Sequence, residues 1–272
     1  MTPLENVCGF LAKTAPLKLA EDWDNVGLLI GDRKSKVGKI MTCLTISPSV
    51  VKEAVEQKVD LIVAHHPLPF QPIKKITSDN TTGSMLLSLI RHGISVYSSH
   101  TAFDSAESGI NQRWCDRLGV TDTKPLITPP SSGSRTSEQA ANIELGSGRY
   151  GILRSPETLA ELSSRAATSV GGERPRLVGD ANRKVTKIAF ACGSGGSFLA
   201  AAIRSGCHAL VTGEATFHVC LEAESREIGL ILLGHYFSER FAMEELAETL
   251  NEEFPDLRVW ASEQEQDPFV GN

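Results

Sequence analysis

The stretch KIMTCLTISPSVVKEAVEQKVDLIVAHH, residues 39–66, reads as strand, helix and strand. Apolar residues crowd its two ends, whereas the middle segment PSVVKEAVEQKV places them at helical spacing. A strand, a helix and a second strand in this order form a βαβ unit, whose two strands lie parallel in one sheet. The double histidine His65–His66 then falls where the second strand ends.

The same alternation continues along the chain. A helical pattern follows in TGSMLLSLIRHG (82–93), and the apolar run ISVYSSH (94–100) comes next. This order predicts a largely parallel sheet with helices on its faces.

The alternation of apolar runs and helical patterns stops after residue 128. ITPPSSGSRTSEQA (127–140) is rich in Pro, Ser and Gly, and we expect a loop or linker. NIELGSGRYGILR (142–154) is typical of a hairpin or short strand pair. SPETLAELSSRAATSV (155–170) predicts a helix with Ser155 at the N-cap and Pro156 at the first helical position.

A second copy of the βαβ pattern follows this region. KIAFACGSGGSFLAAAIRSGCHALVTGE (187–214) aligns without a gap on residues 39–66, and LILLGHYFSE (230–239) aligns on SVYSSHTAFD (95–104). The second alignment gives His-x-x-x-Asp in one copy and His-x-x-x-Glu in the other. We therefore predict an α/β fold made of duplicated halves, with mainly parallel sheets flanked by helices. The first half is 1–128, the small inserted linker and hairpin/helix region is 129–180, and the second half is 181–272.

Composition narrows the class of protein. The chain has 272 residues, 41% of them hydrophobic, a formal net charge of −6 and a pI near 5.7. This charge argues against a surface that neutralises nucleic-acid phosphates, so nucleic acid is an unlikely partner, although a local basic patch stays open. The six cysteines show no CxxC spacing and indicate free thiols in a reducing compartment. No uncharged run approaches the roughly 20 residues of a membrane span, and we expect a cytoplasmic protein.

The repeated strand ends carry metal-type side chains. Ligands of open α/β sheets collect beyond the carboxyl ends of the strands. Histidine and carboxylate together suit zinc, iron, manganese, nickel or cobalt, and two such ions can share carboxylate bridges. The residues expected at these ends are His65, His66, His100, Asp104, Glu214, His235 and Glu239.

Each of these residues also has an ordinary structural alternative. Adjacent histidines on a strand point to opposite faces, which would make one of them a core residue, unless the following prolines turn both toward one crevice. Asp104 can be an acid in the first turn of a helix. Glu239 lies in an acidic helix, SERFAMEELAETLNEEF, and stands out only because His235 precedes it by four residues. His218 is either a neighbour of the site or helix surface, and His92 and His208 look structural.

Two weaker signals lie after the strand of the second copy. GSGG (193–196) precedes a helix and could offer backbone N–H groups to a phosphate, but a tight turn is the favoured interpretation. Cys192 has no evident catalytic partner in the sequence, and we expect a core residue.

Several of these blocks together resemble the Nif-three-like family, often described as GTP cyclohydrolase 1 type 2 homologues. The blocks are EDWDNVGLLIGD, DLIVAHHPLPFQPIKKIT, SVYSSHTAFDSAESGIN, LVTGEATFHVCLEA and GHYFSERFAMEEL, in this order. The resemblance implies a duplicated α/β fold, two divalent metal ions per subunit and a toroidal homohexamer. It also implies the metal ligands, which fall on His65, His66, Asp104, His235 and Glu239.

The resemblance also implies that three further residues lie near the metal site. His100, Glu214 and His218 become neighbours of the metals and candidates for catalysis. Many members of the family carry an acid after the first strand, in a pattern like LD-x-T, where this chain has LTIS with Thr45. Any role of that acid is in doubt here.

Two functions follow as hypotheses. The first is a metal-dependent hydrolase of an unknown small molecule, with nucleotides and phosphoesters as substrate classes. The second is a metal-stabilised oligomeric scaffold or regulatory protein that binds a protein or nucleic-acid partner. Open coordination positions on the metals favour the first, and closed four-coordinate ions favour the second.

Overall fold

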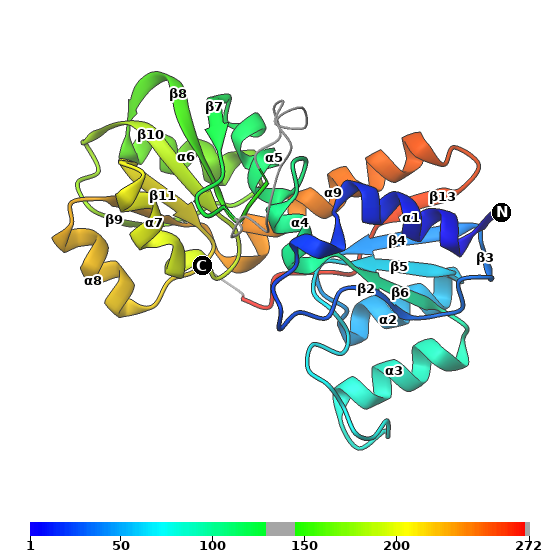
Figure 1. Ribbon diagram of the computed structural model, residues 1–272. Helices are drawn as coiled ribbons and strands as arrows, with labels where there is room; N and C mark the ends of the chain where they lie inside the picture. The colour runs from blue at the N-terminus through cyan, green and yellow to red at the C-terminus, as the bar shows by residue number, and fades with distance from the viewer. Residues whose placement is uncertain (129–144, 270–272) are drawn as a thin grey trace. The chain divides into compact units, whose positions relative to one another are not determined.

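A computed structural model of the chain describes residues 1–128 and 145–269 (Figure 1). It divides into two compact units: unit 1 comprises Met1–Phe103 and Arg240–Val270, and unit 2 comprises Asp104–Glu239. The chain passes between the units within α4 (His100–Ser105) and again within α9 (His235–Glu253). The predicted linker from residue 129 onward, and the first three residues of the predicted hairpin, lie outside the described residues.

Unit 1 contains a five-stranded sheet in the order β13-β4-β5-β6-β2. Four neighbouring strands run parallel, and β2 joins antiparallel to β6 at the edge. The carboxyl ends of β4, β5 and β6 therefore meet at one edge of the sheet. The strands are β13 (Arg258–Ala261), β4 (Lys39–Cys43), β5 (Leu61–Ala64), β6 (Ser95–Ser98) and β2 (Gly27–Ile30).

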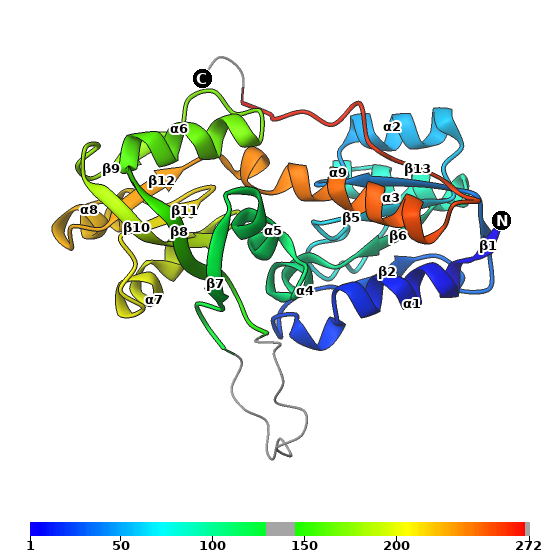
Figure 2. The same ribbon diagram turned by 90° about the horizontal axis from the view of Figure 1, so that it is seen from above.

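Helices cover both faces of this sheet. On one face α2 (Pro48–Gln57) and α3 (Thr81–Arg91) bury apolar residues against β4, β5 and β6. On the other lie α1 (Leu4–Thr14) and the later part of α9 (Figures 1 and 2). The Ser47 side chain caps α2 and Pro48 follows it, which explains why the helix begins there. The smaller elements are η1 (Leu17–Leu19) and the pair β1 (Thr2–Pro3) and β3 (Lys36–Val37).

Unit 2 contains a six-stranded sheet in the order β7-β8-β10-β11-β12-β9. The strands β10, β11 and β12 run parallel, and the others pair antiparallel. The strands are β7 (Val120–Lys124), β8 (Arg149–Thr158), β9 (Arg176–Val178), β10 (Lys184–Ala191), β11 (Ala209–Thr212) and β12 (Gly229–Leu232).

The helices of unit 2 also lie on both faces of its sheet. On one side α7 (Leu199–Arg204) and α8 (Phe217–Ser225) bury apolar residues against the three parallel strands. On the other are α5 (Ile110–Arg117), whose Trp114 stacks on Phe190 of β10, and α6 (Leu159–Ser169). The short η2 (Gly195–Phe198) follows β10.

The duplicated α/β pattern is confirmed. The order β4, α2, β5, α3, β6 in unit 1 recurs in unit 2 as β10, α7, β11, α8, β12, and each set of strands is parallel. None of the helices in the described part of the chain is long and apolar enough to cross a membrane.

The predicted start of the helix at Ser155 is wrong. The strand β8 continues through Ser155 and Pro156 to Thr158, and α6 begins at Leu159. Thr158 and Glu161 form a reciprocal capping box, in which each side chain accepts the backbone N–H of the other. This box satisfies two helix N–H groups at once, which a serine cap before proline would not do.

Candidate metal centre

The two adjacent histidines of unit 1 follow the end of β5 in a bend. The N–H of His65 donates to Cys43 O at 3.0 Å and that of His66 donates to Leu44 O at 2.8 Å, so both consecutive amides face the end of β4, whereas those of a regular strand alternate between its two sides. The two imidazoles lie together, with ring centroids 5.0 Å apart. The His65 residue is buried, with 1% exposure, and His66 is half-buried.

His100 brings a third imidazole to this pair. Its ring centroid lies 5.1 Å from that of His65 and 5.5 Å from that of His66. One potential ligand atom from each of the three residues lies within 4.8 Å of the other two. Unit 1 alone thus assembles three imidazoles at the edge where β5 and β6 end.

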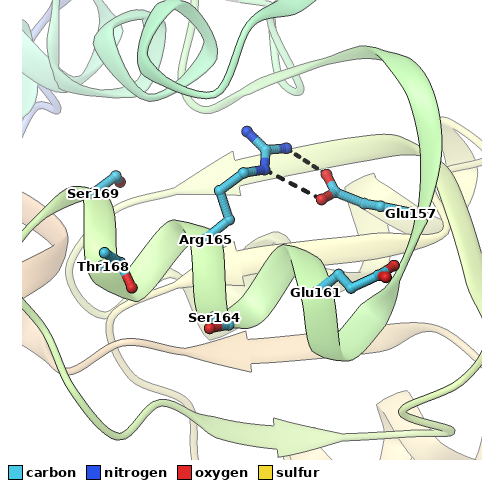
Figure 3. Close-up of a pocket in the computed structure, with 6 residues that line it drawn as sticks. All are labelled: Glu157, Glu161, Ser164, Arg165, Thr168 and Ser169. Carbon is cyan, nitrogen blue, oxygen red and sulfur yellow. Dashed lines mark hydrogen bonds and ion pairs between the residues drawn. The ribbon is translucent and has the colours of Figure 1, made fainter.

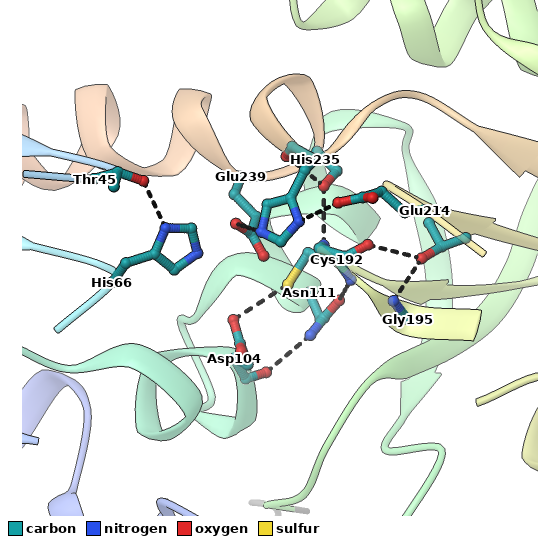
Figure 4. A network of polar contacts seen from close by, with 12 residues as sticks. Thr45, His66, Asp104, Asn111, Cys192, Gly195, Glu214, His235 and Glu239 are labelled. Atoms are coloured by element: carbon teal, nitrogen blue, oxygen red, sulfur yellow. Dashed lines mark hydrogen bonds and ion pairs between the residues drawn. The ribbon is translucent and has the colours of Figure 1, made fainter. Parts of the chain in front are cut away.

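The ring of His66 has a partner on the loop after β4. Its Nδ1 lies 2.6 Å from the Thr45 hydroxyl, shown in Figure 4. The backbone N–H groups of Leu44 and Thr45 donate to the Glu265 carboxylate at 2.9 and 2.5 Å. Burial raises the pKa of Glu265, although these hydrogen bonds and Arg240 oppose the shift. A carboxylate therefore does lie at the Thr45 loop, but it comes from the far end of the chain, and nothing in the local pattern indicates it.

His100 is held by Asp24, which sequence reasoning missed. The Nδ1 of His100 lies 2.7 Å from Asp24 Oδ1, and the side chain of Asp24 is fully buried. Burial alone would raise the pKa of this carboxyl, but hydrogen bonds from His100 and Thr101 outweigh it and lower the pKa to about 2. The only signal in the sequence is that Asp24 lies inside the block EDWDNVGLLIGD.

Unit 2 provides a second donor set at the start of α9. His235 is the first residue of this helix and Glu239 lies one turn later, and the His235 Nε2 is 3.0 Å from Glu239 Oε2. The other ring nitrogen, Nδ1, is 2.5 Å from Glu214 Oε1. The hydrogen bond to Glu239 is the largest cause that raises the pKa of His235 to about 9, against the opposing effect of burial. The imidazole thus lies between two carboxylates, of which Glu239 is buried and Glu214 is exposed.

Asp104 lies in the same unit, braced by two neighbours (Figure 4). The Cys192 thiol donates to Asp104 Oδ1 at 3.2 Å, and the Cys192 N–H donates to Asn111 Oδ1 at 3.0 Å. The Asn111 amide donates in turn to the Asp104 backbone oxygen at 3.1 Å. A carboxylate oxygen of Asp104 lies within 4.8 Å of one of Glu239. The sequence predicts Cys192 to be a core residue with no evident catalytic partner; in the structure it is half-buried and its thiol donates to the Asp104 carboxylate.

The GSGG segment forms a tight turn against these donors. Two of its backbone N–H groups already make hydrogen bonds: that of Gly193 donates to Ser238 Oγ and that of Gly195 donates to Thr212 Oγ1. Gly193 has φ +59°, and a Cβ there would lie 2.2 Å from Glu239 Oε1. Glycine is therefore required both by the backbone and by the space that the Glu239 carboxylate occupies.

The remaining histidines play smaller parts. His218 is exposed at the start of α8, beside the ring of Phe217. His208 Nδ1 accepts the Thr186 N–H at 3.0 Å, and His92 Nδ1 lies 2.8 Å from a backbone oxygen of its own helix, so both have the structural roles predicted for them.

A hollow of about 680 Å³ in unit 2 lies elsewhere, along α6 (Figure 3). Its Arg165 guanidinium already pairs with the Glu157 carboxylate and donates to Leu118 O. The positive charge of Arg165 is thus already paired, and the residues that line the hollow include no imidazole or thiol. The lining residues are Glu157, Glu161, Ser164, Arg165, Thr168 and Ser169.

The donor chemistry fits divalent transition metals. Three imidazoles gather in unit 1, and an imidazole with two carboxylates gathers in unit 2. Nitrogen and oxygen donors of these types are those that zinc, iron, manganese, nickel and cobalt accept. The fold and these groups define an α/β protein of two units whose parallel strand ends carry clustered metal-type donors.

Comparison with known proteins places the chain in a family. Residues 2–268 match the model of Duf34/NIF3 (NGG1p interacting factor 3), and the chain belongs to this family. It is 32% identical over 267 residues to the GTP cyclohydrolase 1 type 2 homolog of Clostridium perfringens, with 98% of each chain covered. It is 31% identical to NIF3-like protein 1 of Drosophila melanogaster, covering 96% of this chain and 86% of the fly protein. The crystal structure of a Bacillus cereus protein related to NIF3 shares the fold, with a TM-score of 0.89 at 21% identity over 100% of this chain and 99% of that one.

Proposed function

We propose that the protein is a metal-dependent hydrolase that binds two divalent ions per chain. The proposed ligands are His65 and His66 in unit 1, and Asp104, His235 and Glu239 in unit 2. The observation that carries the proposal is the pair His65 and His66, whose imidazoles lie together at the end of β5 with ring centroids 5.0 Å apart. The carboxylate pair Asp104 and Glu239 supports it, because carboxylates can bridge two ions.

The proposed chemistry divides between the ions and the protein. Divalent ions bound by these residues would supply Lewis acidity toward a substrate oxygen and toward water near neutral pH. His100 is proposed to move the proton, because its Nδ1 is anchored on Asp24 while its ring lies against the histidine pair. Glu214 orients His235 through Nδ1, as carboxylates commonly do for metal-binding imidazoles. His218 is exposed and is proposed to contact substrate.

The substrate class is proposed from relatives. The Clostridium perfringens protein is called a GTP cyclohydrolase 1 type 2 homolog, which makes nucleotides the first class to test and phosphoesters the second. The metal is proposed to be zinc, iron, manganese, nickel or cobalt.

The proposal is tested by supplying each metal to the purified protein and following hydrolysis of nucleotides and phosphoesters. We expect turnover in the wild type and loss of at least 100-fold in Asp104→Asn and Glu239→Gln. Glu222→Gln in α8 is the matched control, since this acid lies outside both donor sets. Tight metal binding without any turnover would favour the alternative of a metal-stabilised scaffold.

Assembly and location complete the proposal. We propose a toroidal homohexamer, tested by the mass of the purified protein in solution, and a cytoplasmic location. The six cysteines are all free thiols, which suits a reducing compartment.

A further inference from the structure

Asp24 uses both of its carboxylate oxygens on the start of α4, and one of them also on its own loop. Its Oδ1 lies 2.7 Å from His100 Nδ1 and accepts the Asn25 N–H at 2.8 Å, and its Oδ2 accepts the Thr101 N–H at 3.0 Å and the Thr101 hydroxyl. The Asp24 side chain has 0% exposure, whereas its loop is otherwise largely open to water. A buried carboxylate is retained only with strong partners, so these contacts define its role.

The backbone of His100 is itself unusual. Its φ of +25° lies in the left-handed region, which a residue with a side chain rarely adopts. Such a conformation persists where the surroundings over-determine it, and it gathers at functional sites. The Asp24 contacts to the ring of His100 and to the next residue are part of this constraint.

The neighbours of Asp24 hold the same region. The Trp23 ring lies edge-on to the His100 ring with centroids 5.8 Å apart, and Phe70 contacts the same imidazole at 5.8 Å. The Asn25 side-chain amide donates to Pro69 O at 2.9 Å, in the loop that follows the double histidine. Three consecutive residues, Trp23, Asp24 and Asn25, therefore contact the start of α4 and the loop that follows the double histidine.

We propose that Asp24 is a positioning residue that commits His100 to the tautomer with its proton on Nδ1. An ionised carboxylate has no proton to donate, so a neutral imidazole facing it must carry the hydrogen on Nδ1. The other nitrogen, Nε2, is then the basic atom of the ring. The inference rests on the proposed function only for the use of that atom, which would accept or return the proton during hydrolysis.

The substitution Asp24→Asn isolates this role. Asparagine has the same size, and its amide oxygen can still accept from Thr101 and keep the start of α4. With that oxygen on Thr101, the amide nitrogen takes the place of Oδ1, gives up the hydrogen bond from the Asn25 N–H and faces His100 Nδ1 as a donor, which places the imidazole hydrogen on Nε2. Thr101→Val is the matched control, because it removes a hydroxyl contact to Asp24 without changing what faces the imidazole.

The test is long-range ¹H–¹⁵N NMR of the histidine rings, with His100 assigned by the loss of its signals in His100→Gln. We expect Nδ1–H in the wild type and in Thr101→Val, and Nε2–H in Asp24→Asn. A wild-type ring protonated on Nε2 alone, or on both nitrogens, would overturn the proposal. So would an Asp24→Asn ring that keeps Nδ1–H. If Asp24→Asn does not fold, the wild type and Thr101→Val still decide.

Zinc binding separates this proposal from the proposed function. Zinc affinity is measured by chelator competition in the same samples, and we expect Asp24→Asn to stay within about three-fold of the wild type, because His100 is not among the proposed ligands. Failure of the wild type to bind zinc, manganese or iron would contradict the proposed function and leave the tautomer result standing. A loss of zinc affinity of about 10-fold or more in Asp24→Asn would overturn the assignment of His100 as a proton carrier and make it a ligand.

Discussion

The Nε2 atom of His235 lies 3.0 Å from Oε2 of Glu239, one turn further along α9. An imidazole and a buried carboxylate at this distance either share a proton or share a metal ion. In the metal-free protein the proton is favoured, which is why the pKa of His235 is raised to about 9. Metal binding must displace that proton, so pH and metal compete at this residue.

The first prediction concerns pH and the stability of the metal-free protein. Because the folded-state pKa of His235 lies above its ordinary value of 6.5, the protonated ring contributes stability that is fully present below pH 6.5 and is lost as pH rises through about 9. Urea unfolding from pH 6 to pH 9.5 should show wild-type stability falling relative to His235→Gln. The ring is partly exposed, so the effect is modest. Parallel curves for the two proteins would refute the raised pKa.

The second prediction concerns Gly193. Gly193→Ala places a methyl group 2.2 Å from Glu239 Oε1 at a left-handed φ, and we expect a loss of roughly 2–3 kcal/mol in unfolding free energy together with weaker metal binding. Gly206→Ala is the control, since Gly206 has φ +68° but nothing within 4 Å of its added Cβ, and it should lose only about 1 kcal/mol. Equal losses would show that Glu239 does not occupy the space beside Gly193.

The third prediction concerns Cys192 as a brace for Asp104. Cys192→Ala removes the donor to Asp104 Oδ1 and should weaken metal binding by about 10-fold, whereas Cys192→Ser retains a donor and should remain near the wild type. Competition titrations with zinc measure both variants. Cys220→Ala in α8 serves as control. If Cys192→Ala binds zinc as tightly as the wild type, the Cys192 thiol does not support Asp104 as a metal ligand.

The fourth prediction concerns the start of α6. Thr158→Ala breaks the capping box with Glu161 and should cost about 1 kcal/mol of unfolding free energy. Ser155→Ala, at the position where the local pattern predicts the cap, should change stability by less than about 0.5 kcal/mol, because Ser155 lies within β8. The reverse order of the two effects would restore the predicted helix start.

The repeated architecture could be predicted because the local pattern of apolar and polar residues indicates each of its strands and helices. Apolar runs mark β4, β5, β10 and β11, and helical spacing marks the segments between them. The donors at the strand ends follow from the same pattern, since parallel strands place their carboxyl ends together. The predicted helix start at Ser155 is wrong because Ser-Pro is a strong local signal for a helix start, whereas pairing of β8 with β10 extends the strand past it to Thr158.

The supporting residues could not be predicted because their contacts span long separations in sequence. Asp24 meets His100 across 76 residues, and Glu265 meets the N–H of Thr45 across 220 residues. No periodicity connects such pairs. The carboxylate of Glu265 accepts the N–H groups of Leu44 and Thr45, and nothing in the sequence around Thr45 indicates this contact.

The central claim is that these donor sets bind metal, and elemental analysis of the purified, tag-free protein tests it most directly. We predict about two transition-metal ions per chain in the wild type and their loss in His65→Ala/Asp104→Ala, with His92→Ala as a control that keeps them. A wild type that carries no metal, and takes up none from zinc, manganese or iron, would contradict the account.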